Sequence, residues 1–497
     1  MKKSLATITL IIAVKISALA QFIINDVAVG DPNVSYASIE FTSQWEYMVW
    51  DEMAGNGTDT TVTWHCGIDS MTGNLIPPDG KGFRAIESTI WGRATPGRDS
   101  QGVFYVGMNR SGQLVLVRPT NATTGTVTIL PTPVDVTRRA IYATDLPQQP
   151  SSVGYVFWIK NSNVPGGPGN TQNTWVELRY ISLSNPSVEV VLQHQNRPPA
   201  PSTGWAPLDA VFPRCMRGSA KVTSGIRDTN GYLQVVEFDL SQATPTALLV
   251  TAATDTVSKT DAFPWTFGNQ DILMSGIAGG TGATNIYTRP VNTQFFTPVE
   301  VITPMVATLT PPVFSQSNER IPFCGMPYTC FQVNGSDTGF FQTIFGPGEI
   351  WLSTILQSPQ QQWRLSEDSL TGKNDNEPYV GHSKVWVFYL STPRDSALLT
   401  TVAHLHRCET PLSCLTGVAE QSNSNSTVVY PNPASTEIKI NLPSNNNFEI
   451  EIFNTLGETV LKTKNKSTID ISQLSTGIYF LKINQANQFY SAKFVRQ

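Results

Sequence analysis

The chain has 497 residues, a formal net charge of −5 and only 14% charged residues. This balance leaves no basic patch for a phosphate backbone, so we expect no nucleic-acid partner. Gly, Pro, Thr, Ser and Asn take the place of charge, which is typical of secreted β-proteins.

The first twenty residues predict a signal peptide, residues 1–20. A basic "MKK" precedes an apolar run, and the small residues Ala18-Leu19-Ala20 form a cleavage pattern before Gln21. The run is too short to span a bilayer as a mature helix, and no later segment is apolar enough to cross one. We therefore expect a mature chain without a membrane span that is soluble after export.

Residues 21–406 consist of short β-rich runs separated by Gly, Asn, Asp and Pro, with almost no helical periodicity. The repeats recur about every 50–65 residues, a period typical of a β-propeller with four-stranded blades. We expect an all-β fold with six or seven blades, and favour seven. An N-terminal strand, Phe22–Val29, is expected to complete the last blade and close the ring. Repeat starts lie near Asp31, Trp91, Asp145, Asp209, Asp261, Pro311 and Glu377.

Acids recur near these repeat starts, most clearly in "DAVFPRCM" from Asp209 and "DAFPWTFG" from Asp261. One interpretation is structural, since Asp side chains often accept hydrogen bonds from backbone N–H groups in turns. The other is functional, because acids that converge at a channel mouth would have raised pKa values. The candidate catalytic residues are Asp31, Asp209, Asp261 and Glu377, and the candidate substrate-binding residues are Trp205, Arg214, Trp265 and His382.

Three strand starts, "GDPNVSYAS", "IWGRATPGRDSQGVFYVG" and "NEPYVGHSKVWVFYLS", loosely resemble the blade openings of propeller-type glycoside hydrolases. The resemblance implies that Asp31 is a general base and Glu377 a general acid, because glycosidic hydrolysis needs two carboxyls with unlike pKa values. The second start departs from that family, with Gly92-Arg93 in place of Ala-Pro. Asp51-Glu52 is a further pair, but adjacent strand residues point to opposite faces.

We favour an enzyme that acts on extracellular polysaccharide, either a glycoside hydrolase or a polysaccharide lyase, and keep a non-catalytic binding protein as the alternative. A polysaccharide lyase needs a His or Tyr base and a cation for a uronate carboxylate, for which His65, His194, Arg214, Arg217, Tyr379 and His382 are available. A non-catalytic glycan-binding or adhesive protein would use Trp faces to stack on sugars. Extracellular polysaccharide is the expected partner in every case. We expect His65 to be a packed or rim histidine rather than a base.

The six cysteines suit an oxidising compartment, and proximity favours the pairs Cys324–Cys330, Cys408–Cys414 and Cys66–Cys215. His404 and His406 form the only closely spaced histidine pair, so a zinc site is not expected. The cofactor is left unknown, with a structural calcium ion as one possibility.

A Ser/Asn-rich linker, residues 407–427, precedes a tail of different composition, residues 428–497. The tail contains "YPNPA", "EIFNTLGETVLK" and "IDISQLSTGIYFLKI" in that order. These motifs resemble the C-terminal sorting domain of the Bacteroidetes type IX secretion system. The resemblance implies a small β-sandwich, contact with the type IX secretion machinery, and a protein that is secreted or attached to the cell surface.

Overall fold

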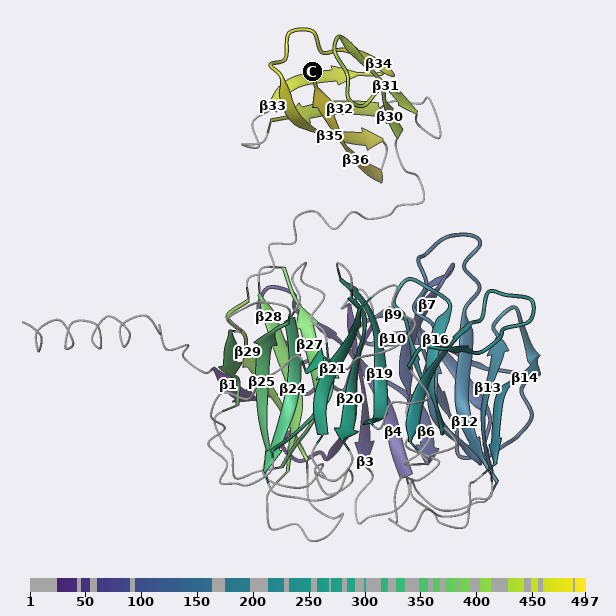
Figure 1. Ribbon diagram of the computed structural model, residues 1–497. Helices are drawn as coiled ribbons and strands as arrows, with labels where there is room; N and C mark the ends of the chain where they lie inside the picture. The colour runs from purple at the N-terminus through teal and green to yellow at the C-terminus, as the bar shows by residue number, and fades with distance from the viewer. Residues whose placement is uncertain are drawn as a thin grey trace, which may run out of the picture. The chain divides into compact units, whose positions relative to one another are not determined.

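The protein is seen in a computed structural model in which every regular element of the described residues is a β-strand (Figure 1). The chain divides into two compact units, Met1–Thr416 and Gly417–Gln497. The structure describes residues 25–42, 46–53, 60–89, 94–162, 175–196, 213–227, 232–251, 257–267, 270–278, 284–290, 299–300, 314–320, 328–335, 348–355, 361–366, 372–382, 384–392, 403–412, 428–441, 448–454, 459–485 and 488–497. The expected signal peptide lies outside these residues.

Within its described residues, the large unit forms seven small antiparallel sheets, which we number in chain order. Sheet 1 contains β2 (Tyr36–Phe41), β3 (Tyr47–Met53), β4 (Thr60–Ile68), β5 (Leu75–Ile76) and β6 (Phe83–Thr89). Sheet 2 contains β7 (Thr95–Asp99), β8 (Gly102–Met108), β9 (Leu114–Asn121) and β10 (Thr124–Ile129). Sheet 3 contains β11 (Arg138–Ala143), β12 (Tyr155–Asn161), β13 (Trp175–Ser182) and β14 (Asn185–Asn196).

The remaining sheets of the large unit follow the same order of strands. Sheet 4 contains β15 (Arg214–Cys215), β16 (Lys221–Arg227), β17 (Leu233–Asp239) and β18 (Leu248–Leu249). Sheet 5 contains β19 (Val257–Phe267), β20 (Gln270–Ala278), β21 (Thr284–Pro290) and β22 (Val299–Glu300). Sheet 6 contains β23 (Phe314–Arg320), β24 (Tyr328–Gly335), β25 (Gly348–Thr354) and β26 (Gln362–Arg364). Sheet 7 contains β27 (Gly372–Val380), β28 (Val385–Thr392), β29 (His404–Glu409) and β1 (Asp26–Ala28).

Sheet 7 is built from both ends of the large unit. β1 pairs antiparallel with β29, with Asp26 opposite Cys408 and Ala28 opposite His406. The predicted pairing of an N-terminal strand with the last repeat is therefore confirmed, over Asp26–Ala28. β29 also extends to Glu409, so the range 407–427 expected as linker begins inside a strand.

The first strands of the seven sheets contact one another in chain order. β2 contacts β7, β7 contacts β11, and the series continues through β15, β19 and β23 to β27, which in turn contacts β2. The series is thus closed, and a parallel bridge between Arg98 and Asp145 shows that the chain runs the same way at the ends of β7 and β11. Figure 1 shows the later strands of sheet 3, β12, β13 and β14, side by side in that order.

Apolar side chains fill the spaces between neighbouring sheets. Trp50 and Cys66 of sheet 1 belong to one buried cluster with Trp386 and Phe388 of sheet 7. Phe104 of sheet 2 packs in the same way in a cluster with residues of sheet 3. The sheets pack in this way because their middle strands are rich in β-branched and aromatic residues and are buried on both faces.

Register shifts separate the first strand from the second in five of the sheets. The ladders are irregular between Tyr36 and Ser38, Arg139 and Tyr142, Thr260 and Phe263, Ser317 and Arg320, and Asn374 and Glu377. β-bulges of this kind insert an extra residue, bend the strand and re-aim nearby side chains. Acidic positions on the first strands therefore differ in their depth along the strand.

The predicted placement of acids at strand starts is wrong for three of the repeats. Asp145 follows β11, Asp261 falls inside the register shift of β19, and Glu377 lies within β27 just after its register shift. Asp31 does precede its strand, β2. The prolines that suggested a common pattern do not mark a common backbone position, because the register shifts offset the strands.

The expected bridge between Cys66 and Cys215 is also wrong. Both residues are free thiols. Cys66 is completely buried in the core between sheets 1 and 7, whereas the Cys215 thiol donates a 3.2 Å hydrogen bond to the carbonyl oxygen of Ala143. Cys324 and Cys414 lie outside the described residues, so the two short-range pairs stay predictions.

The small unit has two sheets around one buried cluster. The first contains β30 (Val428–Tyr430), β31 (Glu437–Asn441) and β34 (Thr468–Asp470). The second contains β32 (Phe448–Phe453), β33 (Thr459–Lys464), β35 (Gly477–Gln485) and β36 (Gln488–Arg496). Ile450, Ile452, Leu481 and Ile483 alternate with exposed or half-buried polar residues, as expected for strands with one solvated face.

Candidate functional site

Asp31 serves its own turn before β2. Its Oδ1 accepts a 2.9 Å hydrogen bond from the Asn33 backbone N–H, and its backbone N–H donates to the Tyr36 hydroxyl at 2.9 Å. The bond from Asn33, with help from Lys81, holds the pKa of Asp31 below its usual range. Asp31 therefore has the structural role described above, in which its carboxylate accepts a backbone hydrogen bond within a turn.

Asp31 also belongs to a partly exposed group that we call the Trp64 platform, formed by Asp31, Glu52, Trp64 and Lys81. The Lys81 Nζ lies 3.3 Å from Asp31 Oδ2 and 3.6 Å from Glu52 Oε1. The Trp64 Nε1–H donates to Glu52 Oε2 at 2.8 Å, and Nζ of Lys81 lies 6.0 Å from the Trp64 ring centroid. One lysine thus bridges two carboxylates beside an indole.

The packing of sheet 1 fixes the direction of the Trp64 ring. Trp64 stacks on Trp50 with ring centroids 6.3 Å apart, and Trp50 donates a 2.8 Å hydrogen bond to the Gly80 carbonyl. Asp51 points to the other face, where it is buried and accepts a 2.6 Å hydrogen bond from the Thr63 hydroxyl. The expected division of Asp51 and Glu52 between two faces is confirmed.

A second charged group, the Arg98 cluster, joins three successive sheets and consists of Arg98, Asp145 and Arg217. Arg98 Nε lies 3.1 Å from Asp145 Oδ1, and Arg217 Nε lies 3.5 Å from Asp145 Oδ2. Arg98 is the penultimate residue of β7, Asp145 follows β11, and Arg217 lies in the turn between β15 and β16. Asp145, the acid near one of the repeat starts, therefore links its own sheet to both neighbouring sheets through ion pairs.

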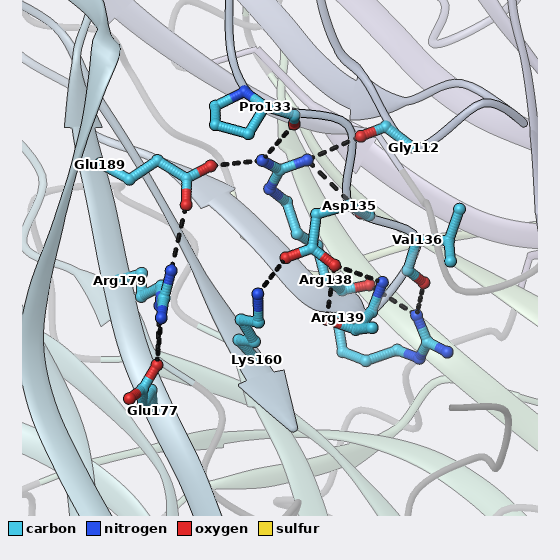
Figure 2. Close-up of polar contacts among 11 residues, drawn as sticks. Gly112, Pro133, Asp135, Val136, Arg138, Arg139, Lys160, Glu177, Arg179 and Glu189 are labelled. Atoms are coloured by element: carbon cyan, nitrogen blue, oxygen red, sulfur yellow. Dashed lines mark hydrogen bonds and ion pairs between the residues drawn. The ribbon is translucent and has the colours of Figure 1, made fainter. Parts of the chain in front are cut away.

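The third group is an ion network on sheet 3 (Figure 2). The buried Arg138 donates to the carbonyl oxygens of Gly112 and Pro133 at 2.7 and 2.8 Å and bonds Glu189. Glu189 also pairs with Arg179 at 3.2 Å, and the Arg138 guanidinium lies 5.0 Å from the Trp158 ring centroid.

The sheet 3 network continues to its outer strand. Arg179 pairs with Glu177 at 2.6 Å, and Glu177 accepts a 2.9 Å contact from His194 Nδ1. Nearby, Lys160 pairs with Asp135 at 2.6 Å. Every acid of this network has a basic partner, so the network orders the sheet and offers no spare acid or base.

The other predicted site residues are scattered. Glu377 is buried on β27, Arg214 lies 5.0 Å from the Tyr142 ring centroid, and the backbone N–H of the exposed His382 donates to the Ser70 carbonyl at 2.8 Å. Asp261 and Trp265 lie on β19, where only the backbone is described. Asp209 and Trp205 lie outside the described residues. The catalytic assignments of Glu377, Asp261 and Asp209 and the substrate-binding assignments of Arg214, His382, Trp265 and Trp205 stay predictions.

His65, one of the histidines considered for a lyase, is held in structural contacts. His65 is buried, with Nδ1 2.9 Å from the Tyr105 hydroxyl and Nε2 3.0 Å from the Asn121 carbonyl oxygen. Burial lowers the pKa of His65, and its predicted packing role is confirmed. Tyr379 is buried in the core between sheets 1 and 7, where burial raises its pKa.

The described part of the chain offers no ready metal site. No group of three or more His, Cys, Asp or Glu side chains there is arranged to hold an ion. The described residues therefore offer no such cluster for the structural calcium ion considered from the sequence. None of the described residues form a helix long and apolar enough to cross a membrane.

Sequence comparison assigns the small unit. Residues 428–497 match the model of the secretion system C-terminal sorting domain. The tail is a secretion sorting domain. The protein is therefore exported by the type IX system and is secreted or attached to the cell surface, as predicted from the three tail motifs.

Comparison with solved structures yields only distant similarity. The chain is 12% identical to prolyl oligopeptidase B from Galerina marginata, with a TM-score of 0.38 over 73% of this chain and 48% of that one. It is 9% identical to a putative TolB from Agrobacterium tumefaciens, with a TM-score of 0.35 over 57% and 87%. A protein of unknown function from Dyadobacter fermentans is 11% identical, with a TM-score of 0.37 over 77% and 97%.

These similarities limit what can be transferred. The chain spans about half the length of the prolyl peptidases it matches. No curated protein matches the sequence. The resemblance of the strand starts to propeller-type glycoside hydrolases gains no support from these comparisons.

Sequence reasoning missed several residues of the described sites. Lys81 follows an ordinary turn, "PPDGKG", and Arg98 lies in "TPGRDSQG". Neither has a motif of its own, since their partners come from distant segments. The alternation of Asp51 and Glu52 was the one local signal that could have pointed to the Trp64 platform.

Proposed function

We propose that this protein is a secreted seven-bladed β-propeller, carried by a small sandwich-like sorting domain, that binds extracellular glycan without cleaving it. The closed series of first-strand contacts among the seven sheets supports the propeller. Binding is assigned to the Trp64 platform of sheet 1.

The observation that carries this function is the composition of the Trp64 platform. A partly exposed indole stacks well on the C–H face of a sugar, and carboxylates and an ammonium group bond sugar hydroxyls. Lys81 bridges Asp31 and Glu52, and the lowered pKa of Asp31 keeps that carboxylate ionised. A glycosidase needs one carboxyl that stays protonated, which Asp31 with its lowered pKa does not supply.

The test is a binding and turnover assay on a polysaccharide panel with the purified full chain. We expect retardation in affinity gels without reducing ends or unsaturated uronates as products. Trp64→Ala should weaken binding about tenfold. Lys81→Gln, which does not disturb the core, should also weaken it. Trp175→Ala is the matched control, because Trp175 is half-buried on sheet 3.

Glu377 favours a hydrolase or lyase as the second candidate function. It is a buried carboxyl on a first strand, the kind of position that a catalytic acid at the channel would occupy. Product formation that is abolished by Glu377→Gln, in a variant that unfolds like the parent protein, would establish the enzyme and overturn the binding-only proposal.

A further inference from the structure

The Arg98 cluster is held in place by backbone hydrogen bonds from all three of its sheets. The Arg98 N–H donates to the Thr144 carbonyl and the Leu146 N–H to the Arg98 carbonyl, each at 3.0 Å. The Gly218 N–H donates to the Asp145 carbonyl at 2.7 Å. The side chains therefore project from fixed backbone positions at the ends of first strands.

The cluster brings two positively charged side chains to one carboxylate. The guanidinium groups of Arg98 and Arg217 share the single carboxylate of Asp145. Burial, with the neighbouring charge of Arg98, lowers the pKa of Arg217 against the opposing effect of Asp145. A further anion beside these two guanidinium groups would be stabilised by their positive charge.

Arg98 has unused donors that could hold such an anion. Its Nε is engaged, donating to the Leu146 carbonyl at 2.7 Å and facing Asp145. Its two terminal nitrogens have no hydrogen-bond partner among the residues that the structure describes, although only 14% of the side chain is exposed. A largely buried arginine with a free fork is a ready partner for a carboxylate.

We propose that Arg98, backed by Arg217, binds the carboxylate of an acidic sugar. This inference deepens the proposed function and rests on it for the glycan. The planar guanidinium matches a carboxylate in two parallel hydrogen bonds, and the low local exposure strengthens them. The neighbouring Arg118 does not offer this, because its guanidinium already pairs with Asp99 at 2.6 Å.

Titration calorimetry of the full chain with trigalacturonate and trimannuronate tests the inference. The fully methyl-esterified trimers are the matched ligands, since they keep the sugar but lose the charge. We expect at least one acid to bind tenfold or more tightly than its ester. Arg98→Gln should remove this preference, Arg98→Lys should retain part of it, and Arg118→Gln should leave it unchanged.

Each result decides between the proposals. Equal binding of acid and ester by the parent protein, or a preference that survives Arg98→Gln, overturns the carboxylate site. If Arg98→Gln fails to fold, Arg98→Lys decides, because lysine keeps the charge without the fork: a reduced preference supports the carboxylate site, and an undiminished preference overturns it. Ester binding that depends on Trp64 without any acid preference leaves the proposed function intact. Arg98-dependent acid binding that ignores Trp64→Ala overturns the Trp64 platform alone.

Discussion

The Tyr389 hydroxyl donates a 2.5 Å hydrogen bond to Asp26 Oδ2 across 363 residues of chain. Nδ1 of His406 lies 3.2 Å from the other oxygen of Asp26, and its ring stacks on Tyr389 with centroids 5.3 Å apart. The three residues come from β1, β28 and β29. They fix the short N-terminal strand, which the ladder with β29 alone would hold only over Asp26–Ala28.

Asp26→Ala should therefore destabilise the large unit. The change removes the acceptor for a fully buried tyrosine hydroxyl, and we expect a loss of about 2–3 kcal/mol in the free energy of unfolding. Denaturant titration monitored by tryptophan fluorescence measures this loss. Tyr389→Phe is the control that removes the donor instead, and its loss should be smaller because Asp26 keeps its contact with His406. An Asp26→Ala protein as stable as the parent would contradict the role of this pair.

Glu189→Ala should destabilise sheet 3 by more than an exposed ion pair would. It leaves Arg138, whose side chain is completely buried, without its carboxylate, and we expect a loss of about 3 kcal/mol. Glu87→Ala is the matched control, because Glu87 pairs with Arg84 where both side chains are about half exposed. Its loss should stay below about 1 kcal/mol. Equal losses in the two variants would show that the buried network adds nothing.

The contact between His194 and Glu177 should depend on pH in both directions. The hydrogen bond that His194 donates to Glu177 raises the pKa of His194 above 6.5. Burial raises the pKa of Glu177, but hydrogen bonds from His194 and Arg179 outweigh it and lower that pKa. The pair thus stabilises the fold fully at pH values below the ordinary His pKa. This stabilisation is lost as the pH rises through the raised pKa of His194 in the folded protein. On the acid side the contribution is lost as pH falls through the lowered pKa of Glu177.

An NMR titration of the histidine ring protons checks the pH dependence. In Glu177→Gln the pKa of His194 should fall toward 6.5, because the carboxylate that stabilises the imidazolium is gone. The resonances of the other histidines serve as internal controls and should not move. An unchanged His194 midpoint in the variant would show that the contact is absent in solution.

Cys66 and Cys215 should be unreactive thiols in the folded protein. Burial raises the pKa of Cys215 to about 12 and also raises that of Cys66. Since the thiolate is the reactive form, alkylation at pH 8 should modify neither residue until the chain is unfolded. Mass spectrometry of alkylated peptides under non-reducing conditions measures this. A Cys66–Cys215 bridged peptide would contradict the structure.

The sequence predicts the repeats well because their signals are local. Period, turn residues and aromatic content lie within each repeat, and the tail motifs lie within one short segment. The pairing of β1 with β29 was also predictable, since the last repeat lacked a strand and the chain had one spare at its start. Such arguments need no knowledge of which side chains meet.

The position of the acids could not be predicted in the same way. A register shift in β19 or β27 moves Asp261 or Glu377 along its strand, and nothing in the local pattern reveals the extra residue. Arg98 finds Asp145 only because sheets 2 and 3 pack, and Lys81 meets Asp31 through a long-range contact. The Cys66–Cys215 pair failed for the same reason, because chain distance gives no spatial distance.

The two-ended construction of sheet 7 has a consequence for the order of folding. Asp26 emerges early in synthesis, yet its contact with His406 spans 380 residues. Closing so long a loop is entropically unfavourable until the intervening chain is already organised. The N-terminal strand must therefore wait for the last repeat, and closure of the series of seven sheets is a late step of folding rather than its nucleus.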